Sequence, residues 1–330
     1  MKSLPAIAIA AFALLACCSA GLAQEDEIVA NLAGGRVIIL VARDTIIFGA
    51  IDQPLEAKSV PPRVAALGPE HIGILFGASE WQIPAQPRPI RLDRDVPQIV
   101  PPNPHSYRPA DSGEPDLEAI GVAYLEKLRP LVSQLHHKID LQPGDPLFEI
   151  VLIGYPRNYG PEVWLLDYNV EQELVGGNNE YWQTHILRPR FTQLYPPEKH
   201  QAKTIVESFF PANQQEVPLI GLIQANDPRV ARFRSADPKF AKVIEFLEHG
   251  QSTKANPDDA ADFLRGVLPV LAGKETFIQG KMDDTAGFQW IVPPEEPVQR
   301  ANQPKNDQDQ DRPPDAPTLM RKPNPNQKPN

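Results

Sequence analysis

Cysteine is almost absent from this chain of 330 residues, which contains only Cys17 and Cys18. Both lie within the first 23 residues, where Lys2, an apolar stretch over residues 6–16 and small residues before position 24 form the pattern of a secretory signal. Cleavage after Ala23 leaves a mature chain without a thiol. Such a chain forms no disulfide and offers no cysteine ligand to a metal ion.

Long apolar runs are also missing. The stretch over residues 6–16 is too short to span the hydrocarbon core of a bilayer, which is roughly 30 Å thick. We therefore expect no transmembrane segment in the mature chain, and an exported protein of the periplasm or the extracellular space. A lipid anchor on Cys17 is the alternative, because residues 14–17 loosely resemble a lipobox in which Leu15 fits poorly.

Positive charge is in deficit. The sequence has 32 Lys and Arg against 42 Asp and Glu, and the loss of Lys2 with the signal changes the formal net charge from −10 to −11. An acidic protein surface repels phosphate backbones and anionic lipid headgroups. We expect no nucleic-acid partner, whereas a protein partner is compatible with this composition and is not identified by it.

Motifs for metals and cofactors are absent as well. His136 and His137 are adjacent, so on a helix they point in different directions and do not share a ligand. Gly176 and Gly177 are not followed by the Lys-Ser/Thr pair of a phosphate-binding loop. We therefore expect no metal ion and no cofactor.

Proline is abundant, and it divides the chain. Residues 82–115 are rich in proline, and their segments 86–89 and 101–104 are incompatible with a helix or a central strand, which predicts an extended insertion. Residues 293–330 combine Pro, Asn, Gln, Asp and Lys with hardly any large apolar side chain, which predicts disorder. The sequence therefore predicts one domain over residues 24–292, interrupted by the insertion and followed by a tail.

Residues 36–76 have the pattern of two consecutive β-hairpins. Their strands are almost continuously apolar, which indicates a sheet that is covered on both faces. The first hairpin joins residues 36–41 to residues 45–52, and the second joins residues 63–67 to residues 72–77.

Regular elements return after the insertion. Helical spacing predicts a helix over residues 117–135, and helix starts are expected where a capping side chain precedes proline, at Asp237-Pro238 and Asn256-Pro257. Strands are predicted at residues 148–155, 163–168 and 288–292. Buried sheets and amphipathic helices in this order favour an α+β fold with stacked helix, sheet, sheet and helix layers.

The element order and several local segments resemble proteasome-type N-terminal-nucleophile hydrolases, whose fold is a four-layer αββα sandwich. The resemblance covers residues 34–81, 117–170 and 237–292. Arg36 stands where that family has its catalytic threonine, and Asp52 where it has an acidic residue near the nucleophile. Arg63 stands at the family's catalytic lysine, and Gly77 at the glycine whose amide helps to bind the oxyanion. The insertion over 82–115 replaces the family's first long helix.

The chemistry of the family is not retained at these positions. Its mechanism needs a hydroxyl or thiol on the first residue of the mature chain, and residues 24–44 contain no Ser, Thr or Cys. Arg63 does not release a proton as lysine does. We expect a non-catalytic protein in which Asp52 pairs with Arg63 or Arg36.

Such a protein acts by binding or assembly, as a monomer or small oligomer, with the proline-rich insertion as the expected partner-binding surface. Two alternatives remain open. One is a secreted amidohydrolase or peptidase with a different nucleophile, and the other is a cell-envelope scaffold that acts through its proline-rich segments.

Overall fold

The computed structural model describes residues 28–52, 62–67, 71–84, 86–97, 117–139, 141, 145–155, 160–196, 205–210 and 216–294. All of these residues except Pro294 belong to one compact unit, which ends at Pro293. The expected signal at residues 1–23, with Cys17, lies outside the described residues, and so do residues 98–115 of the expected insertion and the tail beyond residue 294.

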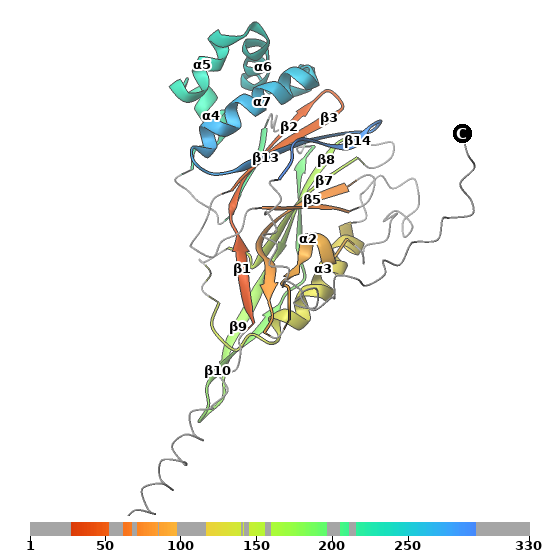
Figure 1. The fold of residues 1–330 in the computed structure, drawn as a ribbon, viewed down its shortest axis with the longest axis vertical. Coiled ribbons are helices and arrows are strands. Elements are labelled where there is room, and N and C mark those ends of the chain that lie inside the picture. The colour runs from red at the N-terminus through yellow and green to blue at the C-terminus, as the bar shows by residue number, and fades with distance from the viewer. Residues whose placement is uncertain are drawn as a thin grey trace, which may run out of the picture. The chain divides into compact units, whose positions relative to one another are not determined.

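The first hairpin lies at the centre of a five-stranded antiparallel sheet (Figure 1). The strands are β12 (Ile205–Phe210), β2 (Gly35–Ala42), β3 (Thr45–Asp52), β13 (Phe277–Asp283) and β14 (Gly287–Val292), in that order. Every residue of β2 is buried. The apolar run had predicted a strand covered on both faces, and this prediction is confirmed.

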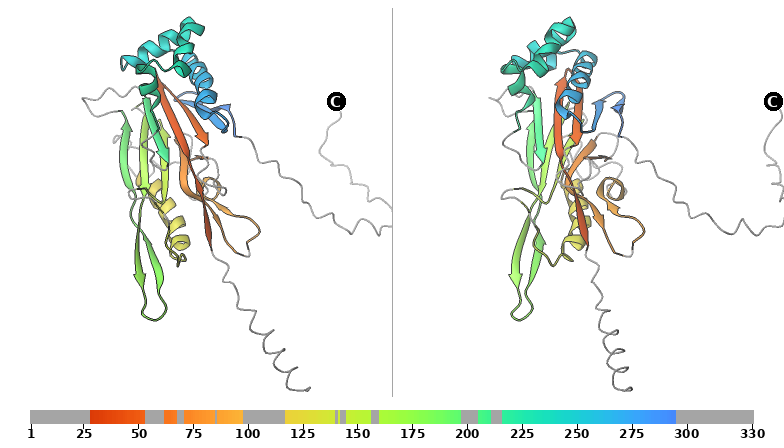
Figure 2. Two further views of the ribbon diagram at one scale, coloured as in Figure 1. Left: turned by 90° about the vertical axis from the view of Figure 1, so that its left-hand side faces the viewer. Right: turned by 60° about the vertical axis from the view of Figure 1, so that its left-hand side comes forward.

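The second hairpin belongs to a separate seven-stranded sheet. Its main path is β1 (Val29–Ala33), β5 (His71–Gln82), β7 (Phe148–Gly154), β8 (Glu162–Tyr168) and β11 (Arg190–Tyr195). The short strands β4 (Arg63–Ala66) and β6 (Ile90–Arg91) also pair with β5. Strands β9 (Val170–Val175) and β10 (Tyr181–Ile186) form a two-stranded ribbon that extends away from this sheet (Figures 1 and 2).

The two sheets pack face to face through one apolar cluster. Val37, Ile39 and Phe48 contribute from the first sheet, and Phe76 and Val151 contribute from the second. Side chains alternate along a strand, so the intervening residues point to the opposite face. That opposite face of each sheet packs against helices.

Helices α4 (Leu219–Gln224), α5 (Pro228–Ala236), α6 (Pro238–Glu248) and α7 (Pro257–Ala272) cover the outer face of the first sheet. The predicted caps are present. Asp237 accepts a hydrogen bond from the Lys239 amide, Asn256 accepts from the amides of residues 258 and 259, and Gly273 ends α7 with φ of 64°. Among the helices that the structure describes, none is long and apolar enough to cross a membrane.

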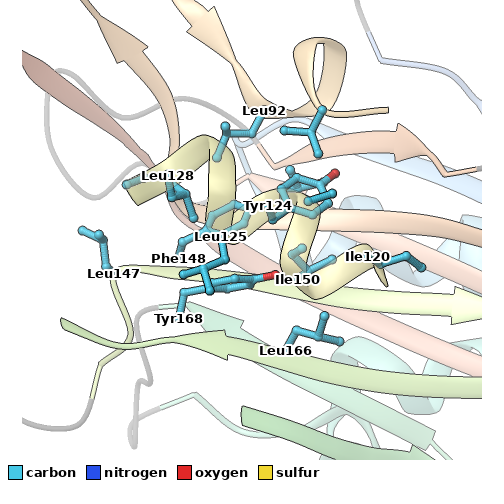
Figure 3. Close-up of a cluster of buried hydrophobic side chains, with 14 of the residues drawn as sticks. Leu92, Ile120, Tyr124, Leu125, Leu128, Leu147, Phe148, Ile150, Leu166 and Tyr168 are labelled. Atoms are coloured by element: carbon cyan, nitrogen blue, oxygen red, sulfur yellow. The ribbon is translucent and has the colours of Figure 1, made fainter. Parts of the chain in front are cut away.

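Helix α3 (Leu117–Val132) covers the outer face of the second sheet (Figure 3). Its buried side chains, including Tyr124 and Leu128, point toward Phe148 and Tyr168 of the sheet. The Tyr168 hydroxyl donates a hydrogen bond to the Gly121 carbonyl at 3.2 Å. The chain thus has an α+β fold of antiparallel sheets with helices outside.

The insertion is less extended than its proline content predicted. Its first part contains β6 and the one-turn helix α2 (Leu92–Asp95), so the prediction of an extended insertion is wrong at the residues of α2. Leu92 and Val96 are completely buried, because their spacing of four residues places both on the side of α2 that faces the core. Apolar burial therefore orders this part of the chain despite its prolines.

Candidate functional site

The positions implied by the resemblance gather at one end of the two facing sheets. Asp52 at the end of β3 pairs with Gly35 at the start of β2, next to Arg36. A β-carbon on Gly35 would lie 3.2 Å from the Phe76 ring, so this end of the first sheet touches β5 beside Gly77. Strand β4 pairs with β5 and places Arg63 opposite Leu75, two residues before Gly77.

Arg36 is held in a buried ion pair with Glu207 of β12. Its Nη2 and Nε lie 2.6 and 3.0 Å from Glu207 Oε1, and Nη2 donates to the Val217 carbonyl at 3.3 Å. The guanidinium also lies 5.0 Å from the centroid of the Phe209 ring. The exposed fractions of the two paired side chains are 8% and 5%, so water contributes little to their solvation.

Glu207 extends this contact to the helical layer. Its second oxygen, Oε2, accepts a hydrogen bond from the Leu219 amide at 2.6 Å, at the beginning of α4. Burial raises the pKa of Glu207, while Arg36 and the Leu219 amide act in the opposite direction. The pair therefore joins β2, β12 and α4, on the face of the sheet that carries Ile38 and Leu40.

Arg63 and Asp52 do not form the expected pair. Arg63 Nη2 contacts Glu80 Oε2 at 3.0 Å, and Asn31 donates to the other oxygen of the same carboxylate at 3.0 Å. Asp52 Oδ1 is buried without a hydrogen-bond partner among the described residues. Burial, followed by the charge of Glu275, raises the pKa of Asp52. Arg36 therefore pairs with Glu207, and Arg63 pairs with Glu80, rather than with Asp52.

The surroundings of Gly77 leave no room for a side chain. Its φ of +73° is in the left-handed region, and a β-carbon would lie 2.4 Å from the Leu147 carbonyl oxygen and 2.9 Å from Phe210. The Phe76 and Phe210 rings stack with centroids 6.3 Å apart. Phe210 of β12 therefore fills the space beside Gly77.

A second polar contact lies just behind Phe210, between the sheets. Ser208 of β12 donates its hydroxyl to Glu149 Oε1 of β7 at 2.8 Å. Asp167 lies opposite Glu149 on β8 and contacts Arg190 Nη2 at 3.2 Å. Burial of Glu149, which is 5% exposed, raises its pKa to about 8, and the charges of Asp167 and Asp145 act in the same direction.

The Ser208–Glu149 distance is that of a nucleophile and its general base. The protonation state argues against this use. With a pKa of about 8, Glu149 is mostly protonated at neutral pH and is then unable to accept the proton of Ser208. At neutral pH the contact is therefore a hydrogen bond that joins the two sheets.

Glu207, Ser208 and Glu149 were not predicted as site residues from the sequence. A signal was present, because a charged residue inside an otherwise apolar strand, as in residues 148–154, must have a partner or be neutral. Residues 205–210 likewise carry an adjacent Glu and Ser between apolar neighbours. On a strand, these two side chains point to opposite faces.

Neither a metal-binding cluster nor a similar protein of known function identifies a site in the described part of the chain. Within the ranges that the structure describes, no three His, Cys, Asp or Glu side chains lie close enough to share a metal ion. No protein-family model and no curated protein matches the chain.

Proposed function

We propose that the chain is an exported, non-catalytic protein with the four-layer αββα fold of proteasome-type N-terminal-nucleophile hydrolases, and that it acts by binding or assembly. Two facing antiparallel sheets, with α3 on one outer face and α4–α7 on the other, support this layering. The central position of the first hairpin in its sheet supports it as well.

The ion pair of Arg36 with Glu207 is the observation that carries the non-catalytic part of the proposal. At the position of the family's nucleophile, a buried cation is fixed by a carboxylate, a carbonyl and an aromatic ring. The chain also continues backwards from Arg36 into β1, which pairs with β5 of the other sheet. Exposure of an α-amine at residue 36 would require removal of this strand.

The export part of the proposal is supported by the pattern of residues 1–23 and by the absence of cysteine after them. The intact mass of protein recovered outside the cytoplasm of its host tests this part. We expect a chain that begins near Gln24. A lipid on Cys17 would place the protein at a membrane instead, and an uncleaved chain in the cytoplasm would remove the export claim.

An electrophile that acylates or alkylates N-terminal threonine tests the non-catalytic part. We expect no increase in the intact mass of the purified chain after incubation, and no turnover of peptide or simple amide substrates. An active proteasome-type hydrolase is the positive control. Turnover that is lost in both Arg36→Ala and Asp52→Ala variants, while the folded fraction stays constant, would show that the altered site is active.

A serine hydrolase centred on Ser208 is the second candidate function, and the 2.8 Å contact with Glu149 is the observation that favours it. A fluorophosphonate probe distinguishes the two. Above pH 8, where Glu149 is ionised, a hydrolase would acquire the label on Ser208, and a Ser208→Ala variant would not. Under the non-catalytic proposal neither protein is labelled at any pH.

A further inference from the structure

Helix α3 has a buried face and an exposed ridge. Figure 3 shows Tyr124, Leu125 and Leu128 within the buried cluster between the helix and the sheet. The exposed residues on the opposite side are spaced three or four apart, which aligns them along the helix: Glu118, Val122, Glu126 and Arg129. Val122 is 44% exposed in the middle of this ridge, although it is a large apolar residue.

A groove of about 550 Å³ runs beside the ridge. One wall is α3, and the other is formed by Trp164, Arg188, Pro189 and Phe191. Phe191 is 42% exposed, and its ring packs closely over Gly121, where an added β-carbon would lie 3.0 Å from the ring. The groove is therefore apolar at its centre and charged at its rim.

Two residues of the ridge, Glu118 and Arg129, are complementary in charge. Glu118 lies near the beginning of α3 and Arg129 near its end, with the apolar residue Val122 between them. When two copies of such a helix pack antiparallel about a two-fold axis, residue 118 of each copy lies opposite residue 129 of the other. The same register places Val122 opposite Leu125, which lines the groove.

We propose that the occupant of this groove is α3 of a second copy of the chain, in a symmetric dimer. The ion pair between Glu118 and Arg129 forms twice because the interface is isologous. The register also brings Glu126 to Gly121 of the second copy, close to the wall that carries Arg188. A parallel arrangement would place Glu118 against Glu118 and Arg129 against Arg129, which the charge pattern disfavours.

The size of the surface sets the strength of the dimer. An α-helix of 16 residues is about 24 Å long, so two such helices and their grooves form an interface at the small end of the range for specific complexes. We therefore expect reversible association at micromolar concentration. The inference rests on the assembly part of the proposed function and names its partner, but it is independent of whether the chain is catalytic.

Sedimentation of the purified full chain over a concentration series tests the dimer by charge exchange. Glu118→Arg and Arg129→Glu each convert two attractive contacts into repulsive ones, so each should weaken dimerisation about tenfold or more. The double variant restores opposite charges in exchanged positions and should recover the wild-type affinity. Val122→Asp places a charge beside the two-fold axis and should weaken it at least a hundredfold.

The matched control is Glu245→Arg, a charge reversal at an exposed position of α6 that should leave the affinity unchanged. Circular dichroism confirms that each variant is folded, which is expected because every substituted side chain is at least partly exposed. A wild-type chain that stays monomeric at high micromolar concentration would overturn the proposal. So would a double variant as weak as the single ones, or a six- or seven-fold ring that these changes do not affect. The labelling experiment with the electrophile tests the non-catalytic proposal separately, because its result does not depend on whether the chain dimerises.

Discussion

The buried carboxyl of Glu149 makes the stability of this chain depend on pH in a way that one substitution should remove. In the folded chain its pKa is raised from 4.5 to about 8, chiefly because burial disfavours the charged form. Glutamine at this position is neutral at every pH and can still accept the hydrogen bond of Ser208. A Glu149→Gln variant therefore keeps the contact and loses the titration.

The direction in which the free energy of unfolding changes with pH is set by which state binds the proton. Between pH 4.5 and 8 the folded chain retains a proton that the unfolded chain releases, so the free energy of unfolding falls as pH rises through this window. One proton corresponds to about 1.4 kcal/mol per pH unit. Over the whole window the wild-type chain should lose about 5 kcal/mol relative to the variant, and outside it the difference should be constant.

Urea denaturation of both proteins at pH 5, 6, 7 and 8 measures this difference directly. Asp52 and Glu207 also have raised pKa values, mainly through burial, but they are present in both proteins and cancel. Asp262→Asn, at an exposed position of α7, is the control for loss of one acidic group. Parallel stability profiles for the wild type and Glu149→Gln would refute the burial argument.

Two further substitutions test how the site is filled. Arg36→Ala leaves Glu207 buried without its cation and should cost about 3–5 kcal/mol in thermal or urea unfolding, and adding Glu207→Gln should recover part of this loss. A loss under 1 kcal/mol would mean that water reaches the carboxylate. Gly77→Ala should cost about 3 kcal/mol or more, since it adds a clash with the Leu147 carbonyl to an unfavourable φ. Gly160→Ala has a similar φ and open surroundings and should cost only about 1 kcal/mol, so equal losses would rule out the clash.

The central hairpins could be predicted because their sequence leaves one solution. Strands such as Gly35–Ala42 are apolar at nearly every position, and only a sheet covered on both faces buries all of them. The caps at Asp237 and Asn256 were equally informative, since a capping side chain followed by proline fixes a helix start locally. These elements depend on near neighbours in the sequence.

The strands between residues 170 and 210 were not predicted, and their composition explains why. Strand β11 is exposed along most of its length and β9 alternates irregularly, so neither has the period of a half-buried strand. The partner of Arg36 was missed for another reason. Glu207 is 171 residues away, and only the antiparallel pairing of β12 with β2 brings the two together.

Strand β12 explains why this end of the two facing sheets is filled. Its consecutive side chains alternate, so Glu207 reaches Arg36 and α4 on one face while Ser208 reaches Glu149 between the sheets. Phe210 then covers Gly77. Opening this end of the sheets would break the pair of Arg36 with Glu207 and leave a buried charge uncompensated. A ligand therefore gains little by entering here, and the outer faces, with the exposed ridge of α3 foremost, are the better place to look for partners.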